Sequence, residues 1–170
     1  MKLTVVMPGR TDGVENTRLG RTASRVMGSL PMTGGLGEKD ENFAVEWIRG
    51  VEDFHTRFSG GGLKNARILF LFDIGATGIC MELYSLLQEI RQNPSGFAGS
   101  IAGLVVDGES EWYTKAVARE FVFSANGSGC LFVGRPLVEA TKGLANFSLA
   151  ARVGNLSPGR AYQEAIRELV

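Results

Sequence analysis

The chain has 170 residues, 44% of them hydrophobic, which is the size and composition of one ordinary globular domain. Eighteen basic side chains balance eighteen acidic ones, so no net charge attracts nucleic acid or an anionic membrane surface. No apolar run approaches the ~18 residues of a membrane span or has the form of a secretory signal. We therefore expect a single cytoplasmic domain over residues 1–170, with neither nucleic acid nor membrane as a partner.

The first apolar, β-branched run covers residues 3–7, and a loop rich in turn-forming residues follows it. Asn16 or Thr17 can cap a helix predicted over residues 17–29. Residues 31–40 contain three glycines and no strand-like alternation, which predicts a surface loop. A second strand is not visible at this point of the sequence.

Aromatic and aliphatic side chains then recur at steps of three and four: Phe43, Trp47, Val51, Phe54 and Phe58. This spacing predicts a helix over residues 41–58 with one strongly aromatic face. Such a face either packs on the sheet or contacts another subunit.

The most apolar run of the chain covers residues 67–72 and predicts a central strand that is covered on both faces. A helix over 80–92 follows it. The plan then repeats, with a strand over 100–106, a helix over 111–125 and a further strand over 130–133.

After residue 133 the pattern weakens, because Arg135–Pro136 predicts a turn and the apolar residues beyond it fit neither the helical nor the strand period. A short amphipathic helix over 158–169 ends the chain. Alternating strands and helices predict an open, doubly wound α/β domain. In such a sheet, backbone N–H groups and helix N-termini collect at the carboxyl ends of the strands, where anionic ligands bind.

The order of elements, with polar loops beginning at Pro8, Asp73 and Asp107, resembles the flavodoxin-like fold and especially the NAD(P)H-dependent FMN reductase family. The resemblance implies a three-layer parallel sheet in the strand order 2-1-3-4-5, with residues 31–40 in place of a lost or irregular second, edge strand. It also implies a homo-oligomeric flavoprotein, an oxidoreductase that binds FMN and uses NADH or NADPH as co-substrate.

The first loop of these reductases has the form Gly-Ser-x-Arg with a later Ser or Thr, and Gly9, Arg10, Thr11, Asn16 and Thr17 occupy its place here. The resemblance implies that Gly9 allows close backbone approach and that Arg10, Thr11 and Thr17 bind the FMN phosphate. The same residues also suit a plain strand-to-helix turn with an exposed arginine.

The second loop departs from the family, which has a Pro-x-Tyr-Asn type of turn where this chain has Gly75, Ala76, Thr77 and Gly78 after Asp73. The resemblance places these four residues along the flavin ring.

The third loop contains Asp107, Gly108, Glu109 and Ser110. The resemblance implies that this loop covers the flavin, where its two acids would lower the flavin potential. The same acids also suit helix capping without any further function.

Side-chain catalysis has little support in the sequence. The single histidine, His55, lies at the edge of the aromatic helix face, and no nucleophile elbow or metal-ligand spacing occurs. Cys80 and Cys130 lie in apolar segments and are expected to be structural thiols. We therefore predict no catalytic side chain and no metal, and a bound cofactor must supply any redox chemistry. The alternative is a non-catalytic flavodoxin-like module for binding or assembly.

Overall fold

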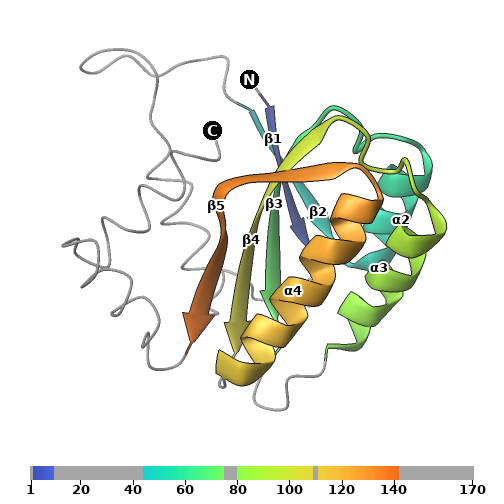
Figure 1. The fold of residues 1–170 in the computed structure, drawn as a ribbon. Coiled ribbons are helices and arrows are strands. Elements are labelled where there is room, and N and C mark those ends of the chain that lie inside the picture. The colour runs from blue at the N-terminus through green and yellow to red at the C-terminus, as the bar shows by residue number, and fades with distance from the viewer. Residues whose placement is uncertain (1, 10–43, 75–79, 109–110, 142–170) are drawn as a thin grey trace.

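The computed structural model describes residues 2–9, 44–74, 80–108 and 111–141, and Figure 1 shows how they are arranged. These ranges contain β1 (Lys2–Met7), β2 (Ala44–Arg49), α2 (Val51–Ser59), β3 (Arg67–Asp73), α3 (Met81–Gln92), β4 (Ser100–Gly108), α4 (Glu111–Gly127) and β5 (Cys130–Thr141). The predicted helices over 17–29 and 158–169, and the predicted loop over 31–40, lie outside the described residues.

The five strands form one sheet in the order β2-β1-β3-β4-β5, and every neighbouring pair is parallel. This order confirms the predicted α/β sheet of flavodoxin-like type. The chain passes from β1 outward to β2 and then adds β3, β4 and β5 on the other side of β1. The direction of strand addition therefore reverses at β1, and sheets of this kind bind ligands outside the carboxyl ends of the strands at such a reversal.

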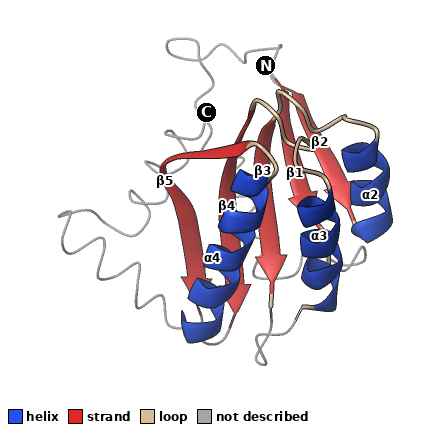
Figure 2. Cartoon of the chain, turned by 45° about the vertical axis from the view of Figure 1, so that its right-hand side comes forward, coloured by secondary structure: helices blue, strands red, loops and turns tan. Residues whose placement is uncertain are grey.

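The helices α2, α3 and α4 lie side by side on one face of the sheet (Figure 2). Each turns one stripe of side chains inward, at steps of three and four residues, because that spacing follows the helical period. The buried stripe of α3 consists of Leu83, Leu86, Leu87 and Ile90, and that of α4 includes Ala118, Phe121 and Ala125. Both helices match their predicted ranges to within two residues.

A cluster of six buried phenylalanines joins these helices to the sheet: Phe54, Phe58, Phe70, Phe72, Phe97 and Phe121. The ring of Phe121 lies edge-on to those of Phe70 and Phe72, with its centroid 4.6 Å from each. The rings of Phe58 and Phe97 are 4.7 Å apart. Burial of each such side chain contributes about 1.5–3 kcal/mol, so the cluster is a principal source of stability for this face.

The central strand β3 is buried on both faces, as its apolar run predicts. Residues 68–72 are all at most 3% exposed, although successive side chains of a strand point to opposite faces. Ile68, Phe70 and Phe72 contact the helices through the core cluster, while Leu69 and Leu71 face the other side.

The prediction of one helix over residues 41–58, and of a lost second strand, was wrong. Residues 44–49 form β2, the edge strand beside β1, and only residues 51–59 are helical. The helical spacing of the aromatic residues concealed a boundary at Gly50, whose φ of +84° is readily reached only by glycine. The Gly50 amide donates a hydrogen bond to the Met7 carbonyl at 3.1 Å, which separates the strand from the helix.

The predicted turn at Arg135–Pro136 does not end the last strand, because β5 continues to Thr141. The pairing with β4 is instead interrupted there: Ala102 lies opposite Phe132 and Leu104 opposite Leu137. Five residue steps on β5 thus match two on β4, which places three extra residues in a bulge. Pro136 lacks the N–H that a regular ladder needs, and a bulge in an edge strand accommodates it.

Within the described residues, no helix is both long and apolar enough to cross a lipid bilayer.

Candidate functional site at the carboxyl ends of the strands

The three loops singled out in the sequence begin at one edge of the sheet. β1, β3 and β4 are adjacent, parallel strands, so their carboxyl ends lie on the same side of the sheet. Pro8 directly follows β1, Asp73 is the last residue of β3, and Asp107 is the last but one of β4. Asp73 and Asp107 are register partners, and the Ile74 amide donates to the Asp107 carbonyl at 2.9 Å. We call this edge the carboxyl rim and define it by Gly9, Arg49, Asp73, Asp107 and Gly108.

Three of the predicted cofactor-binding residues are described by the structure: Gly9, Asp107 and Gly108. The others lie outside the described residues: Arg10, Thr11, Asn16, Thr17, Gly75, Ala76, Thr77, Gly78, Glu109 and Ser110. The structure therefore places the start of each predicted loop, and the ligand contacts of these residues stay predictions.

Gly9 follows β1 and has room around its Cα. A Cβ built at this position meets no described atom within 4 Å. Packing among the described residues thus gives no reason for a glycine here, which is compatible with close approach of a ligand to the backbone.

Gly108, at the end of β4, has a structural explanation. A Cβ at this position would lie 2.7 Å from Ile74 Cγ1 and 3.0 Å from Thr114 Cγ2, both closer than carbon atoms pack. Ile74 and Thr114 are themselves buried. The absence of a side chain at Gly108 thus allows the end of β3 and the start of α4 to pack against β4.

The charge along the carboxyl rim is uneven. The carboxyl side chains of Asp73 and Asp107 stand at the ends of β3 and β4, and Asp107 is buried. On the other side of β1, Arg49 ends β2, with its guanidinium 5.3 Å from the centre of the Trp47 ring. The Arg49 amide also donates to a carboxylate oxygen of Asp53 at 3.2 Å, so the end of β2 carries both signs of charge.

Arg49 was missed as a rim residue, because the spacing of the aromatic side chains placed it in a helix. Gly50 could have indicated that the predicted helix is interrupted, because a glycine inside a helix costs about 1 kcal/mol of stability relative to alanine.

The two cysteines are buried free thiols. Burial raises the pKa of the Cys80 thiol to about 11 and that of Cys130 to about 12, because a thiolate is poorly solvated inside the protein. Both therefore remain protonated at neutral pH and are poor nucleophiles.

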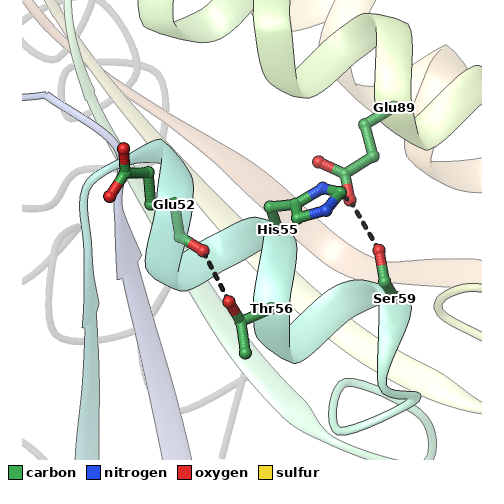
Figure 3. Close-up of polar contacts among 5 residues, drawn as sticks. All are labelled: Glu52, His55, Thr56, Ser59 and Glu89. Carbon is green, nitrogen blue, oxygen red and sulfur yellow. Dashed lines mark hydrogen bonds and ion pairs between the residues drawn. The ribbon is translucent and has the colours of Figure 1, made fainter.

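His55, Ser59 and Glu89 lie together between α2 and α3 and superficially resemble a catalytic triad (Figure 3). His55 Nδ1 lies 2.9 Å from Glu89 Oε1, and the Ser59 hydroxyl donates to the same oxygen at 3.2 Å. The serine is therefore bonded to the carboxylate and not to the imidazole, so no base is placed to activate it. The contact joins two helices at the surface, and among the described residues no group of three metal-ligating side chains occurs.

No protein-family model matches the chain, and no curated protein sequence matches it either. Several solved structures, in contrast, match the fold of this chain. An apo NADH:FMN oxidoreductase has a TM-score of 0.61 at 13% identity, with 99% of this chain and 87% of that chain covered. A Fusobacterium nucleatum flavodoxin bound to flavin mononucleotide has a TM-score of 0.54 at 12% identity, with coverage of 99% and 96%.

An azoreductase from Bacillus anthracis strain Sterne has a TM-score of 0.56 at 8% identity, with 98% of this chain and 99% of that chain covered. At such low identities a likeness establishes the fold and not the activity. Together with the strand order, these matches show that the chain has the flavodoxin-like fold.

Proposed function

We propose that the protein is a flavoprotein that binds FMN at the carboxyl rim and uses it as an NAD(P)H-dependent oxidoreductase. The observation that carries the proposal is the reversal of strand order at β1, which brings the ends of β1 and β3 together beside β4. Solved proteins of the same fold include a flavodoxin bound to flavin mononucleotide and an NADH:FMN oxidoreductase.

The rim fits a phosphorylated flavin in one respect that the structure allows us to test. Among the described residues, Gly9 at the end of β1 leaves space for a phosphate to approach the backbone, and Arg49 ends the neighbouring strand β2. We place the phosphate at the loop that begins at Gly9, where Arg10, Thr11, Asn16 and Thr17 would bind it.

The remaining loops would hold the ring. Residues 75–78 extend from the end of β3 and would lie along the flavin, while Asp107 to Ser110 would cover it or tune its potential. FMN, when bound, supplies hydride transfer between a nicotinamide and an acceptor. The chain itself binds and positions the cofactor, since the described residues offer no activated nucleophile.

Titration of the purified protein with FMN tests the proposal through the absorption band and fluorescence of the flavin. Arg10→Ala should weaken binding by about 1.5–3 kcal/mol, the scale of charge-assisted hydrogen bonds, or about 10- to 150-fold in Kd. Arg119→Ala is the matched control, because Arg119 is an exposed cation in the middle of α4, away from the carboxyl rim, and should leave the affinity unchanged. Equal affinity in both variants would remove the first loop from the site.

A second candidate function is a non-catalytic module for binding or assembly. One observation favours it: close packing against Ile74 and Thr114 explains Gly108 without any ligand. A colourless protein whose spectrum and stability do not respond to FMN would support the module and exclude the flavoprotein.

A further inference from the structure

A second hollow lies at the other edge of the sheet, where the strands β1, β3 and β4 begin. Its volume is about 450 Å³, within the range of about 300–1,000 Å³ typical of small-molecule sites. The residues of its wall that matter here are Lys2, Thr4, Lys64, Asn65, Arg67 and Ile101. We call it the amino-terminal hollow.

The hollow is strongly basic. Three cationic residues line it, Lys2, Lys64 and Arg67, and among the described residues its lining includes no carboxylate. Lys2 forms an ion pair with Glu46 at 2.8 Å, but Glu46 is shared with Arg57, also at 2.8 Å. Lys64 and Arg67 are exposed, and within the described part of the chain neither has an ion-pair partner.

The wall is held in place by hydrogen bonds between two loops. The Asn65 amide donates to the Ala98 carbonyl at 3.0 Å, and the Ile101 amide donates to the Ala66 carbonyl at 2.9 Å. The Ala66 amide donates to the buried Ser100 hydroxyl at 3.1 Å. These bonds fix the backbone on both sides of Lys64 and Arg67. Ligand binding therefore loses little free energy to the ordering of this backbone.

The floor is also sterically defined. Asn65 and Gly99 both have positive φ, +54° and +75°. A Cβ at Gly99 would lie 2.2 Å from Asn65 Oδ1, so the two loops meet without space for another side chain. The hollow is therefore bounded by a fixed surface between the starts of β3 and β4.

We propose that the amino-terminal hollow binds a small molecule that carries two or more phosphate groups. Lysine ammonium groups act as point charges toward phosphate, and the arginine guanidinium binds two of its oxygens at once. Ile101 and the aliphatic parts of the lysines offer apolar surface for the rest of the ligand.

This site is separate from the one proposed for FMN. β3 has seven residues, and at about 3.3 Å per residue it spans about 20 Å between the two edges. One FMN molecule at the carboxyl rim thus leaves the hollow vacant, and the inference does not depend on flavin binding.

Pyrophosphate is a suitable probe, titrated into the full-length ¹⁵N-labelled protein at constant ionic strength and followed by amide chemical shifts. We expect saturable shifts of the amides of Gly62, Lys64 to Arg67 and Gly99. Sodium sulfate at the same ionic strength should produce weaker shifts at these amides, because it offers a single anionic group.

The double variant Lys64→Gln/Arg67→Gln should weaken pyrophosphate binding at least about tenfold, since it removes two of the three cations. Both side chains are exposed, so the thermal unfolding midpoint should remain close to that of the parent. Arg119→Gln, which removes an exposed cation from α4, is the matched control and should bind like the parent.

Three outcomes would overturn the proposal: shifts that do not saturate, equal affinities in the double variant and the control, or shifts at Gly9 and Gly108 in place of the expected amides.

Discussion

The two edges of this sheet differ in charge and in construction. At the amino-terminal edge, short loops are tied to the strands by hydrogen bonds and close glycine contacts, and three cations line a hollow. At the carboxyl rim, β3 ends in Asp73 and β4 in Asp107 and Gly108, and Gly9 has no described neighbour that would exclude a side chain. This parallel sheet thus presents two chemically different ends, and a ligand that suits one end is not expected to bind at the other.

The sharpest test of this difference in construction compares glycines. Gly96→Ala would place a methyl group 2.1 Å from Cζ of Phe58, whose ring is already packed against Phe54 and Phe97. We expect a loss of about 3 kcal/mol, the upper end for overpacking of a core. Chemical denaturation measures it.

Gly9→Ala is the matched control at the carboxyl rim and should change the free energy of unfolding by less than about 0.5 kcal/mol. Gly127→Ala, at the end of α4 and therefore at the amino-terminal edge, meets no described atom within 4 Å and controls for position at this edge. Equal losses at Gly96 and Gly9 would remove the contrast between the two edges.

A smaller effect is expected from Ser100→Ala. The Ser100 hydroxyl is buried, donates to the Leu63 carbonyl at 2.5 Å and accepts from the Ala66 amide. Its removal leaves both backbone groups without this partner, at a cost of about 1–3 kcal/mol. Thermal unfolding measures the loss.

Ser59→Ala removes an exposed hydroxyl that bonds Glu89, and it should cost less than about 0.5 kcal/mol. If the two serine variants unfold alike, Ser100 does not anchor the loop beside the amino-terminal hollow.

The smallest effect concerns Glu46, which links the starts of β1 and β2 to α2. A hydrogen bond from Lys2, together with the charges of Lys2 and Arg57, holds the pKa of this carboxyl below its usual 4.5. A lowered folded-state pKa means that the carboxylate stabilises the protein above pH 4.5, and this stability is lost as the pH falls through the folded pKa.

Glu46→Gln should therefore cost up to about 1 kcal/mol near neutral pH and progressively less as the pH falls below 4.5. Urea denaturation at several pH values measures this difference, and 1 M salt should reduce it at neutral pH because salt screens exposed ion pairs. A cost that is independent of pH would assign the effect to packing.

Much of the sheet was predictable because its inner strands have simple patterns. Residues 68–72 are uniformly apolar, and the run becomes the doubly covered strand β3. The buried leucines and isoleucine of α3 follow the helical period closely. β2 was missed because an edge strand has partly exposed side chains, and its single aromatic residue, Trp47, happens to continue the helical spacing of α2.

The position of the candidate site in the sheet could be predicted from the sequence, but the packing contacts of its residues could not. Parallel topology alone brings Pro8, Asp73 and Asp107 to one edge. Close packing at Gly108, however, depends on Ile74 and Thr114, which no local motif connects with it. The amino-terminal hollow was not found in the sequence, since Lys2 and Arg67 are far apart along the chain and come to one edge only through the pairing of β1 with β3.

The bulge in β5 bears on how the molecules behave at high concentration. β5 is the outermost of the described strands on its side of the sheet, and a straight outer strand offers a ready template for pairing with a second copy. Three surplus residues, one of them Pro136, interrupt the regular backbone groups along that strand. The irregularity therefore disfavours strand-to-strand stacking of neighbouring molecules and helps to protect the protein from fibrillar aggregation.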